Sequence, residues 1–514
     1  MPQLVVGNAL RAAVRKMPQK TAFVFKDHRI TYKAFNERVN RLANGLLAEG
    51  HQPGDHIAIL AFNCIEYYEI LFAVAKAGMV AVPVNFRFQS EEISYIINHS
   101  DSSVLIYEAH FREALLKVRR ELEKIGSGSY IVFGGDGEPG DVSYEELIAG
   151  SHENDPDIDV SEDTTWYFGY TSGTTGMPKG ALRSHRANIL IAANDIYIRE
   201  DDVLLLIMPI FHTNSLAFGL ISVYQGATTV IYPSGGFDPR EILEIIDREK
   251  VTFSSLVPTM FAMIMEVPDK ENFETRSLRK VLTSSAPLMT KTKEQILDFF
   301  QHAQFFEGYG ATELGGVTTL HPKDQERKLR SCGKANPFTI VKILDADGNE
   351  CSPGEVGELY AISPGMFEGY YKQPEADAKA FRGDFLTVGD MVKVDDEGFY
   401  YLVDRKNDMI ISGGENIYPT EIDDLLAAHP KVLEVAVIGV PDEKWGEAVK
   451  AVIVCKPGED LTEKEVIDYC KQHLAGYKCP KSVDFWDSLP LNPMGKILKR
   501  EIREKYWEGY DVKL

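Results

Sequence analysis

The sequence from residue 57 to residue 84 reads IAILAFNCIEYYEILFAVAKAGMVAVPV. Two short runs of Val, Ile, Leu and Ala, at 57–61 and 80–84, stand on either side of a longer apolar stretch at 65–77. Short runs that are apolar on both faces are typical of buried parallel strands, and the longer stretch has helical spacing. We therefore expect a strand, a helix and a second strand of one parallel sheet.

The same alternation of strand-like and helix-like stretches continues along the chain. It pairs 80–84 with 91–98, 104–108 with 113–124, 227–232 with 239–250, 251–256 with 258–266 and 281–284 with 290–300, and it ends on a strand at 304–307. The pattern predicts an α/β protein with doubly wound, largely parallel sheets covered by helices. Ligands of such sheets bind at the carboxyl ends of the strands.

From about residue 340 the sequence changes to short strand-like pieces separated by glycines, which predict a β-rich subdomain. These pieces lie at 340–344, 357–361, 391–394 and 399–403. A polar cluster at 404–408 then precedes a compact α+β pattern, with helices at 419–428 and 463–474 and strands at 432–440, 448–455 and 482–486. We expect an N-terminal domain of residues 1–406 and a small, mobile C-terminal domain of residues 407–514.

Composition and charge limit the possible partners. The 514 residues are 44% hydrophobic and 26% charged, which is typical of a globular protein with more than one structural unit. The 55 Lys and Arg against 77 Asp and Glu give a net charge of −22, which repels nucleic acids. An anionic small molecule must therefore be held by local amides, a metal ion or a few placed cations.

Cysteine usage and the apolar runs bear on location. The six cysteines form no C-x-x-C or Cys/His metal pattern, which favours a reducing compartment and no structural zinc. The N-terminal stretch lacks the basic-then-apolar order of a secretory signal. The longest apolar run, 203–211, is far shorter than the roughly 20 residues of a membrane span. We expect a cytoplasmic protein with no membrane span.

A predicted strand at 165–170 leads into a segment rich in glycine and hydroxyl side chains. It comprises Thr171, Ser172, Gly173, Thr174, Thr175, Gly176, Met177, Pro178, Lys179 and Gly180. Backbone N–H groups turned by glycines, hydroxyl donors and one lysine together suit a polyphosphate. The segment is not a Walker A loop, because Pro178 stands where that motif requires its second glycine. The alternative is a flexible surface turn.

A second segment, which we expect to be a loop after the strand at 304–307, carries an aromatic ring, a hydroxyl and a carboxylate. It comprises Gly308, Tyr309, Gly310, Ala311, Thr312 and Glu313. Glu313 occupies the place of the third glycine of a dinucleotide fingerprint, so that motif is excluded. The segment could stack a base, donate to a phosphate and hold Mg²⁺, or Tyr309 could simply pack.

These two loops and six further motifs resemble, in the same order and over essentially the whole chain, the superfamily of adenylate-forming (AMP-binding) enzymes. The further motifs are PIFH at 209–212, SAP at 285–287, GD at 389–390, DR at 404–405, SGGEN at 412–416 and NPMGK at 492–496. The stretches 404–419, 441–447 and 477–481 look most like fatty-acyl-CoA synthetases. The resemblance implies an acid–thiol ligase that forms an acyl-adenylate and diphosphate from ATP and then transfers the acyl group to CoA with release of AMP. Mg²⁺, ATP and CoA are the cofactor and co-substrates that it implies.

The resemblance also implies a role for each motif. Residues 171–176 and Lys179 hold the β- and γ-phosphates, and Asp390 and Arg405 hold the ribose. The adenine slot consists of Tyr309 and the backbone of Ser285, Ala286 and Pro287, and Gly308 and Gly310 also bind ATP or AMP. The catalytic residues are Lys496, His212, Thr312 and Glu313, with Thr312 at the α-phosphate, Glu313 on the metal, and Lys496 acting in the first half-reaction only.

Without the resemblance, several of these residues have simpler interpretations. Asp390 follows a glycine and could be a turn residue. Lys496 in a Gly-Lys pair could be a solvated charge, and His212 could be a buried histidine with satisfied hydrogen bonds. The ordered set of motifs favours the catalytic interpretation.

The C-terminal motifs imply a hinge and a CoA path. Asn407 stands at the turning point, where the family more often has Asp or Lys, and asparagine tolerates the backbone conformations of a hinge. The residues implied for CoA are Gly413, Gly414, Trp445, Tyr477 and Lys481. Cys479 stands where some relatives have arginine.

The acyl pocket implied by position relative to the motifs comprises 212–216, Tyr224, 256–260 and 315–318. These residues are mostly small or apolar and include no arginine for a second carboxylate, so we expect an uncharged medium- or long-chain fatty acid. The alternatives are an aryl-CoA ligase of the benzoate or cinnamate type, an enzyme that loads a carrier protein, a luciferase-like oxygenase and an inactive binding module. The expected partners are the acid, ATP and CoA, with a homodimer as one assembly.

Overall fold

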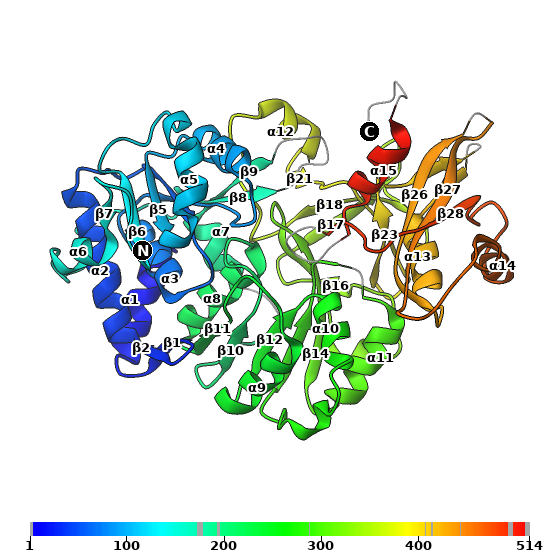
Figure 1. Ribbon diagram of the computed structural model, residues 1–514, viewed down its shortest axis with the longest axis horizontal. Coiled ribbons are helices and arrows are strands. Elements are labelled where there is room, and N and C mark those ends of the chain that lie inside the picture. The colour runs from blue at the N-terminus through cyan, green and yellow to red at the C-terminus, as the bar shows by residue number, and fades with distance from the viewer. Residues whose placement is uncertain are drawn as a thin grey trace.

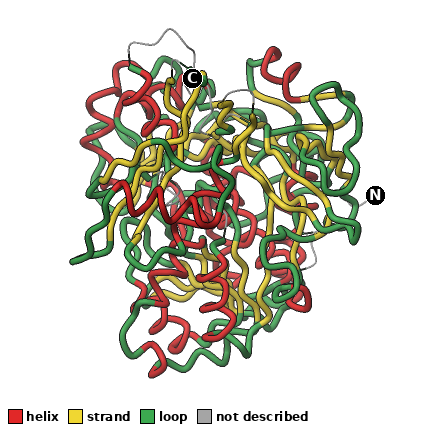
Figure 2. The backbone as a smooth tube through the Cα atoms, turned by 90° about the vertical axis from the view of Figure 1, so that its right-hand side faces the viewer, coloured by secondary structure: helices red, strands yellow, loops and turns green. Residues whose placement is uncertain are grey.

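The structure, a computed structural model, describes residues 4–171, 178–192, 196–286, 288–406, 408–412, 415–442, 444–491 and 497–508. Two large sheets with helices between and outside them form the N-terminal part, and a smaller unit with its own sheet follows (Figure 1). In the view turned by 90°, strands and helices alternate through the body of the molecule (Figure 2). The predicted α/β class is confirmed; that the C-terminal unit is mobile stays a prediction.

The stretch at 57–84 forms the centre of the first sheet, as predicted. β3 (His56–Leu60) and β4 (Val80–Pro83) pair in parallel, and α3 (Ile65–Lys76) connects them. The strand order is β7 (Val142–Ser143), β6 (Tyr130–Phe133), β5 (Val104–Glu108), β3, β4, β8 (Thr165–Thr171), β9 (Lys179–Ser184) and β19 (Gly369–Tyr370). The pairs from β7 to β8 are parallel, and β8, β9 and β19 pair antiparallel.

The second sheet is parallel in its centre and antiparallel at both edges. Its order is β16 (Lys334–Ala335), β15 (Gly315–Leu320), β14 (Gln304–Ala311), β13 (Lys280–Thr283), β12 (Phe253–Leu256), β10 (Val203–Leu206), β11 (Thr228–Ile231), β1 (Thr21–Phe25) and β2 (His28–Thr31). The carboxyl ends of β8 in the first sheet and of β12, β13 and β14 in the second sheet supply the site described below.

Helices fill the space between the sheets and cover their outer faces. α3 and α8 (Thr213–Gln225) share one apolar core with residues of both sheets. α9 (Pro239–Glu249), α10 (Pro258–Met265) and α11 (Thr290–Phe299) cover the second sheet, and α4 (Ser90–His99) and α5 (Arg112–Val118) cover the first. The other helices of the N-terminal part are α1 (Val6–Lys16), α2 (Tyr32–Ala48), α6 (Tyr144–Ala149), α7 (His185–Leu190) and α12 (Pro374–Ala380).

Local sequence explains where some helices begin and end. The Asp238 side chain accepts from Arg240 N at 2.9 Å, Pro239 occupies the first helical position of α9, and Lys250 ends that helix with φ of 51°. In α14 (Glu463–His473), Thr462 and Glu465 form a capping box. These signals agree with the boundaries that the sequence predicts.

The β-rich subdomain and the C-terminal unit have the predicted elements. The subdomain contains β17 (Ile340–Leu344), β18 (Gly357–Ile362), β20 (Phe381–Arg382), β21 (Phe385–Leu386), β22 (Asp390–Val394) and β23 (Tyr400–Arg405). The C-terminal unit contains β24 (Ile410–Ser412), β25 (Glu415–Ile417), α13 (Pro419–Ala427), β26 (Val432–Asp442), β27 (Gly446–Cys455), α14, β28 (Ser482–Phe485) and α15 (Lys499–Trp507).

Two expectations are wrong. Gly308 to Ala311 do not form a loop, because β14 continues through them and pairs antiparallel with β15. The α-helix predicted at 113–124 ends at Val118 and is followed by a short 3-10 helix, Arg119–Glu121. The Arg119 guanidinium binds Asp141 and lies 3.6 Å from the centre of the Tyr130 ring. Among the described residues, no helix has the length and apolar character needed to cross a membrane.

Candidate active site

The β8–β9 hairpin brings the two ends of the glycine-rich segment together. Thr171, the last residue of β8, pairs directly with Lys179, the first residue of β9. Thr171 Oγ1 donates to Glu313 Oε1 at 3.2 Å, so the two predicted phosphate-handling segments touch. The predicted loop residues Ser172, Gly173, Thr174, Thr175 and Gly176 lie outside the described residues.

The Glu313 carboxylate is buried among neutral donors. Glu313 is 8% exposed, and the Tyr370 hydroxyl donates to its Oε1 at 2.8 Å. The Lys179 ammonium lies over the Tyr370 ring, 5.0 Å from its centre. No ion pair to Glu313 occurs within the described part of the chain. A carboxylate flanked by hydroxyl oxygens has the donor chemistry that Mg²⁺ prefers, with substrate phosphates completing the coordination.

Thr312 links the phosphate side of the site to helix α8. Its Oγ1 lies 3.2 Å from Thr213 Oγ1, and either hydroxyl can donate. His212 caps the helix, because its Nδ1 accepts from Asn214 N at 3.3 Å. Burial lowers the pKa of His212 to about 4, so its ring is neutral near pH 7. The N-terminal end of α8 thus presents hydroxyls, a neutral imidazole and the positive end of the helix dipole.

Hydrogen bonds also join the predicted adenine and ribose residues. The Tyr309 hydroxyl donates to Asp390 Oδ2 at 2.6 Å, and Arg405 Nε lies 3.3 Å from Asp390 Oδ1. β22 and β23 place Asp390 directly opposite Arg405. Burial, reinforced by the Asp390 charge, raises the pKa of Tyr309 well above its usual value, so its hydroxyl stays protonated. Asp390 is therefore a buried carboxylate, not a turn residue exposed to solvent.

The backbone of the predicted adenine residues is constrained at two positions, Gly310 and Ser285. A Cβ at Gly310 would lie 2.1 Å from the Gly315 carbonyl oxygen, so a larger residue would push β14 and β15 apart. Ser285 has φ of 72°, which turns the chain sharply next to Ala286, while Pro287 lies outside the described residues. Asn214 Nδ2 donates to Ser284 Oγ at 3.1 Å and to Ser255 Oγ at 2.9 Å, which joins α8 to the ends of β12 and β13.

Two side chains near this site escaped the sequence analysis. Tyr370 lies in β19, which pairs with β9 although almost 200 residues separate them, and no local pattern reveals such pairing. Arg183 Nη1 lies 3.5 Å from the Thr312 carbonyl oxygen. The strand period could have found Arg183, because it follows Lys179 by four residues in β9 and so shares its face.

Sequence families decide what kind of protein has this site. The AMP-binding enzyme family matches residues 10–371, and the AMP-binding enzyme C-terminal domain matches residues 421–496. The chain belongs to the AMP-binding enzyme family.

Relatives of this AMP-binding enzyme span its whole length. It is 36% identical over 509 residues to the long-chain-fatty-acid–CoA ligase FadD13 of Mycobacterium tuberculosis, covering 98% of each chain. It is 36% identical over 501 residues to a feruloyl-CoA synthase of Amycolatopsis sp, covering 96% of this chain and 97% of the relative. The solved structure of ATP-bound MatB from Rhodopseudomonas palustris superposes with a TM-score of 0.90 at 30% identity, covering 99% of this chain and 100% of that one. The AMP-binding enzyme is an AMP-forming acid–thiol ligase, the class of these relatives.

The predicted CoA residues of this AMP-binding enzyme lie on the C-terminal unit. Trp445 is 44% exposed and Tyr477 is 47% exposed, while Lys481 N donates to Val449 O. Within the described ranges no hydrogen bond or ring contact connects these three side chains to Thr312 or Glu313. The predicted residues Asn407, Gly413, Gly414 and Lys496 lie outside the described residues.

Two contacts hold the C-terminal unit against the N-terminal part. Asp404 Oδ2 accepts from Thr420 N at 3.0 Å and from Thr420 Oγ1 at 3.1 Å. Arg330 forms an ion pair with Asp424 of α13. Both contacts join residues before position 407 to residues of α13 after it.

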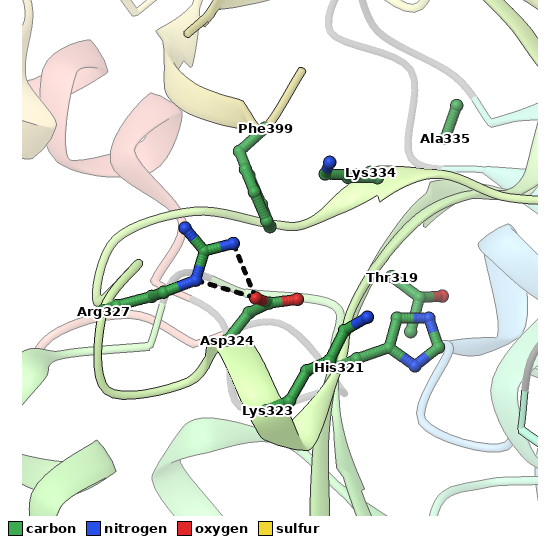
Figure 3. A pocket seen from close by; sticks show the side chains of 8 residues that line it. All are labelled: Thr319, His321, Lys323, Asp324, Arg327, Lys334, Ala335 and Phe399. Carbon is green, nitrogen blue, oxygen red and sulfur yellow. Dashed lines mark hydrogen bonds and ion pairs between the residues drawn. The ribbon is translucent and has the colours of Figure 1, made fainter. Parts of the chain in front are cut away.

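A pocket of about 310 Å³ is lined by residues other than the predicted site residues (Figure 3). Its lining residues are Thr319, His321, Lys323, Asp324, Arg327, Lys334, Ala335 and Phe399. Arg327 pairs with Asp324 at 2.8 Å, and the Lys334 ammonium lies 4.5 Å from the centre of the Phe399 ring. Acid partners and an aromatic face thus already satisfy two of its cations.

Proposed function

We propose that this enzyme activates a carboxylic acid with ATP to an acyl-adenylate and transfers the acyl group to CoA, releasing diphosphate and AMP. The observation that carries the proposal is the chain of contacts from Thr171 through Glu313 to Thr312 and Thr213. These contacts join the β8–β9 hairpin, which binds the phosphates in this proposal, to the N-terminal end of α8, where the acid binds. A carboxylate and an α-phosphate need that proximity in order to react.

In the first half-reaction a carboxylate oxygen attacks the α-phosphorus, and diphosphate leaves. Thr312 donates to the α-phosphate, and Lys179 holds the far phosphates together with the amides and hydroxyls of residues 171–176. The neutral His212 ring and the N-terminal end of α8 accept the acid without adding a competing negative charge. Lys496 reaches the attacking carboxylate and the α-phosphate and stabilises the charge that develops there.

Asp390 and Arg405 bind the ribose hydroxyls. Their mutual ion pair and the Tyr309 hydrogen bond fix the Asp390 carboxylate before the nucleotide arrives. The adenine then lies between the Tyr309 ring and the backbone at Ser285, Ala286 and Pro287. Such prior ordering lowers the entropy cost of binding.

Glu313 holds Mg²⁺ in this proposal, together with phosphate oxygens. The metal supplies charge neutralisation at the diphosphate leaving group. The Thr171 and Tyr370 hydroxyls act on Glu313 itself, because each donates to Oε1 and so orients the carboxylate.

For thioester formation we propose that residues 407–514 rotate about Asn407 as a domain separate from residues 1–406. Gly413 and Gly414 then face the acyl-adenylate and leave space for the pantetheine arm. Trp445, Tyr477 and Lys481 bind the nucleotide part of CoA. The exposure of Trp445 and Tyr477 supports this, since both rings are available to a ligand.

The acid is, in our proposal, a medium- or long-chain aliphatic acid. The apolar residues at 256–260 and the similarity to the long-chain-fatty-acid–CoA ligase support this choice. The equal similarity to a feruloyl-CoA synthase supports an aryl acid as the second candidate. A carrier protein as thiol acceptor, a homodimer and a cytoplasmic location stay predictions from sequence.

The test separates the two half-reactions. Lys496→Ala should abolish diphosphate release from ATP plus acid but largely retain acyl transfer from a supplied acyl-adenylate to CoA, because the lysine acts in one domain arrangement only. Lys505→Ala changes an exposed lysine of α15 and should leave both steps unaltered. Equal loss of both steps would contradict the rotation. AMP formation that needs a phosphopantetheinylated protein and ignores CoA would favour carrier loading.

A screen of carboxylates identifies the acid class. Aliphatic acids of graded length and aromatic acids are compared by diphosphate release, with and without CoA. Aliphatic acids should give the higher kcat/KM. A consistent preference for aromatic acids would overturn that choice in favour of the aryl candidate.

A further inference from the structure

The strongest unexplained feature of the molecule is the buried guanidinium of Arg183. The residue is fully buried in β9, directly opposite Tyr167 in β8. Its Nη1 points to the Thr312 carbonyl oxygen at 3.5 Å. Its Nε and Nη2 have no hydrogen-bond partner among the described residues. A buried cation with one long hydrogen bond and two nitrogens that lack partners is unfavourable in a protein interior, so a ligand is the natural complement.

No carboxylate of the protein neutralises this charge directly. Glu368 and Glu313 are near enough to interact with it electrostatically, but neither forms an ion pair with Arg183 in the described part of the chain. Glu368 instead accepts from Ser184 N at 2.9 Å. Burial raises the pKa of Glu368. Arg183 is therefore left as a cation beside the reaction centre.

Other unpartnered polar atoms occur in the predicted acyl pocket. The Tyr224 hydroxyl and Ser215 Oγ, both on α8, are buried and have no hydrogen-bond partner among the described residues. Burial raises the pKa of Tyr224, and the Arg183 charge opposes that rise, so the two side chains are within electrostatic reach. Tyr224 stays protonated and can donate a hydrogen bond.

The guanidinium also borders the predicted pocket through glycines. A Cβ at Gly365 would lie 3.5 Å from Arg183 Nη2, and a Cβ at Gly315 would lie 3.2 Å from Gly365 Cα. Gly315 begins the predicted acyl segment 315–318. The absence of side chains at both positions leaves the Arg183 nitrogens bordered only by backbone on that side.

We propose that Arg183, with the Tyr224 hydroxyl, binds a second carboxylate of the acid substrate, so that the enzyme activates dicarboxylic acids. The inference rests on the proposed function and names its substrate class. It replaces the uncharged acyl tail that the sequence favours.

The arrangement of the unpartnered atoms selects a carboxylate. Nε and Nη2 lie on one edge of the guanidinium, and together they form the side-on pair of donors that matches the two oxygens of a carboxylate. A neutral acceptor such as an ester carbonyl would use one donor and leave the positive charge buried. An apolar chain end would leave both donors unsatisfied.

The experiment measures kcat/KM for diphosphate release with straight-chain dicarboxylic acids from butanedioate to decanedioate, each against the monocarboxylic acid of equal length. The wild type should prefer the dicarboxylic acid at one or more lengths by roughly tenfold or more, as expected of a charge-assisted pair. Arg183→Met should remove that preference and improve the monocarboxylic acids. Arg183→Lys, which keeps the charge without the side-on pair, should restore part of it.

Stability gives an independent readout. Without acid, Arg183→Met should leave Tm unchanged or raise it, because the variant removes a buried cation that has no protein partner. A clear fall in Tm would show that Arg183 pairs within the protein, which overturns the proposal. Tyr224→Phe removes only the hydroxyl and should reduce the preference for dicarboxylic acids severalfold.

Matched controls separate this site from other cations. Arg186→Met changes an exposed arginine that lies 3.5 Å from Glu162, and Lys334→Met changes the pocket of Figure 3. Neither should alter the preference.

If Arg183→Met raises KM for ATP equally with every acid, Arg183 serves the nucleotide and the proposal fails. If the wild type turns over monocarboxylic acids without any preference, the inference fails while the ligase function stands; if no carboxylate supports AMP formation, the proposed function itself fails.

Discussion

The Tyr370 hydroxyl lies 2.8 Å from Glu313 Oε1, although 57 residues separate them in sequence. The contact depends on β19, which pairs with β9 and holds Tyr370 beside Lys179 at the start of β9. Tyr370, which lies between β18 and β20 in the sequence but in the first sheet in space, thus orients the predicted metal ligand. The sequence alone gives no sign of that role.

Tyr370→Phe should weaken use of Mg·ATP. The variant removes one hydrogen bond to a carboxylate, so we expect KM for Mg·ATP to rise by about tenfold with little change in Tm. Steady-state kinetics at fixed acid and CoA measure it. Tyr371→Phe is the control, because the neighbouring hydroxyl donates to Asp101 at 2.6 Å, away from Glu313. Equal effects of the two variants would count against an orienting role for Tyr370.

Glu313→Gln should raise the magnesium concentration needed for half-maximal adenylation by tenfold or more, because an amide is a much weaker ligand of a hard cation than a carboxylate. A magnesium titration of diphosphate release at saturating ATP gives the result. The exposed Glu326 supplies a control variant, Glu326→Gln. An unchanged titration curve would rule out Glu313 as a metal ligand.

Asp390→Asn should reduce the preference of the enzyme for ATP over 2′-deoxy-ATP. The wild type should use ATP more efficiently than 2′-deoxy-ATP, and the variant should narrow that ratio by roughly tenfold because it weakens a charge-assisted hydrogen bond to a hydroxyl. The ratio of kcat/KM for the two nucleotides is the measurement. Asp396→Asn, at an exposed position of the β22–β23 turn, should leave the ratio as it is. A ratio that stays constant in Asp390→Asn would exclude ribose binding by this residue.

His185 should make the fold sensitive to acid. The side chain is fully buried, its Nδ1 accepts from Val6 N at 3.4 Å, and burial lowers its pKa to about 4 from the usual 6.5. Between those two values the unfolded chain binds a proton that the folded chain does not. The free energy of unfolding therefore falls as pH drops from 6.5 to 4, by up to about 3 kcal/mol in total.

His185→Asn keeps an acceptor for Val6 N but cannot titrate. The slope of unfolding free energy against pH should be shallower in the variant by about 1.4 kcal/mol per pH unit near pH 5. Urea unfolding across the range tests this, with the exposed His28→Asn as control. Parallel curves for wild type and His185→Asn would mean that His185 is solvated or already protonated in the folded state.

Sequence periodicity predicts the parts of the fold that depend on local pattern. The strand predicted at 165–170 is β8, and the five elements predicted after position 408 all occur with boundaries that differ by at most a few residues. Burial on both faces makes such strands uniformly apolar, so composition identifies them. The motifs likewise identify Thr171, Glu313, Asp390 and Arg405, which the structure brings into two hydrogen-bonded groups.

Features that depend on distant pairing escape the sequence. Residues 308–311 look like a loop because of their glycines, yet they are strand residues that a partner strand stabilises. The strand period places Arg183 on the face of Lys179, but it does not reveal that Arg183 is fully buried opposite Tyr167 of β8.

The β8–β9 hairpin carries both Lys179 and Arg183, which stand four residues apart on one face, and Tyr167 within it also donates to the Phe211 carbonyl at 3.0 Å. An acid bound at Arg183 and phosphates bound near Lys179 would therefore both contact the short strand β9. Binding free energies that are coupled through a shared element are reciprocal. The factor by which the proposed dicarboxylic acid changes the affinity for ATP is therefore also the factor by which ATP changes the affinity for that acid.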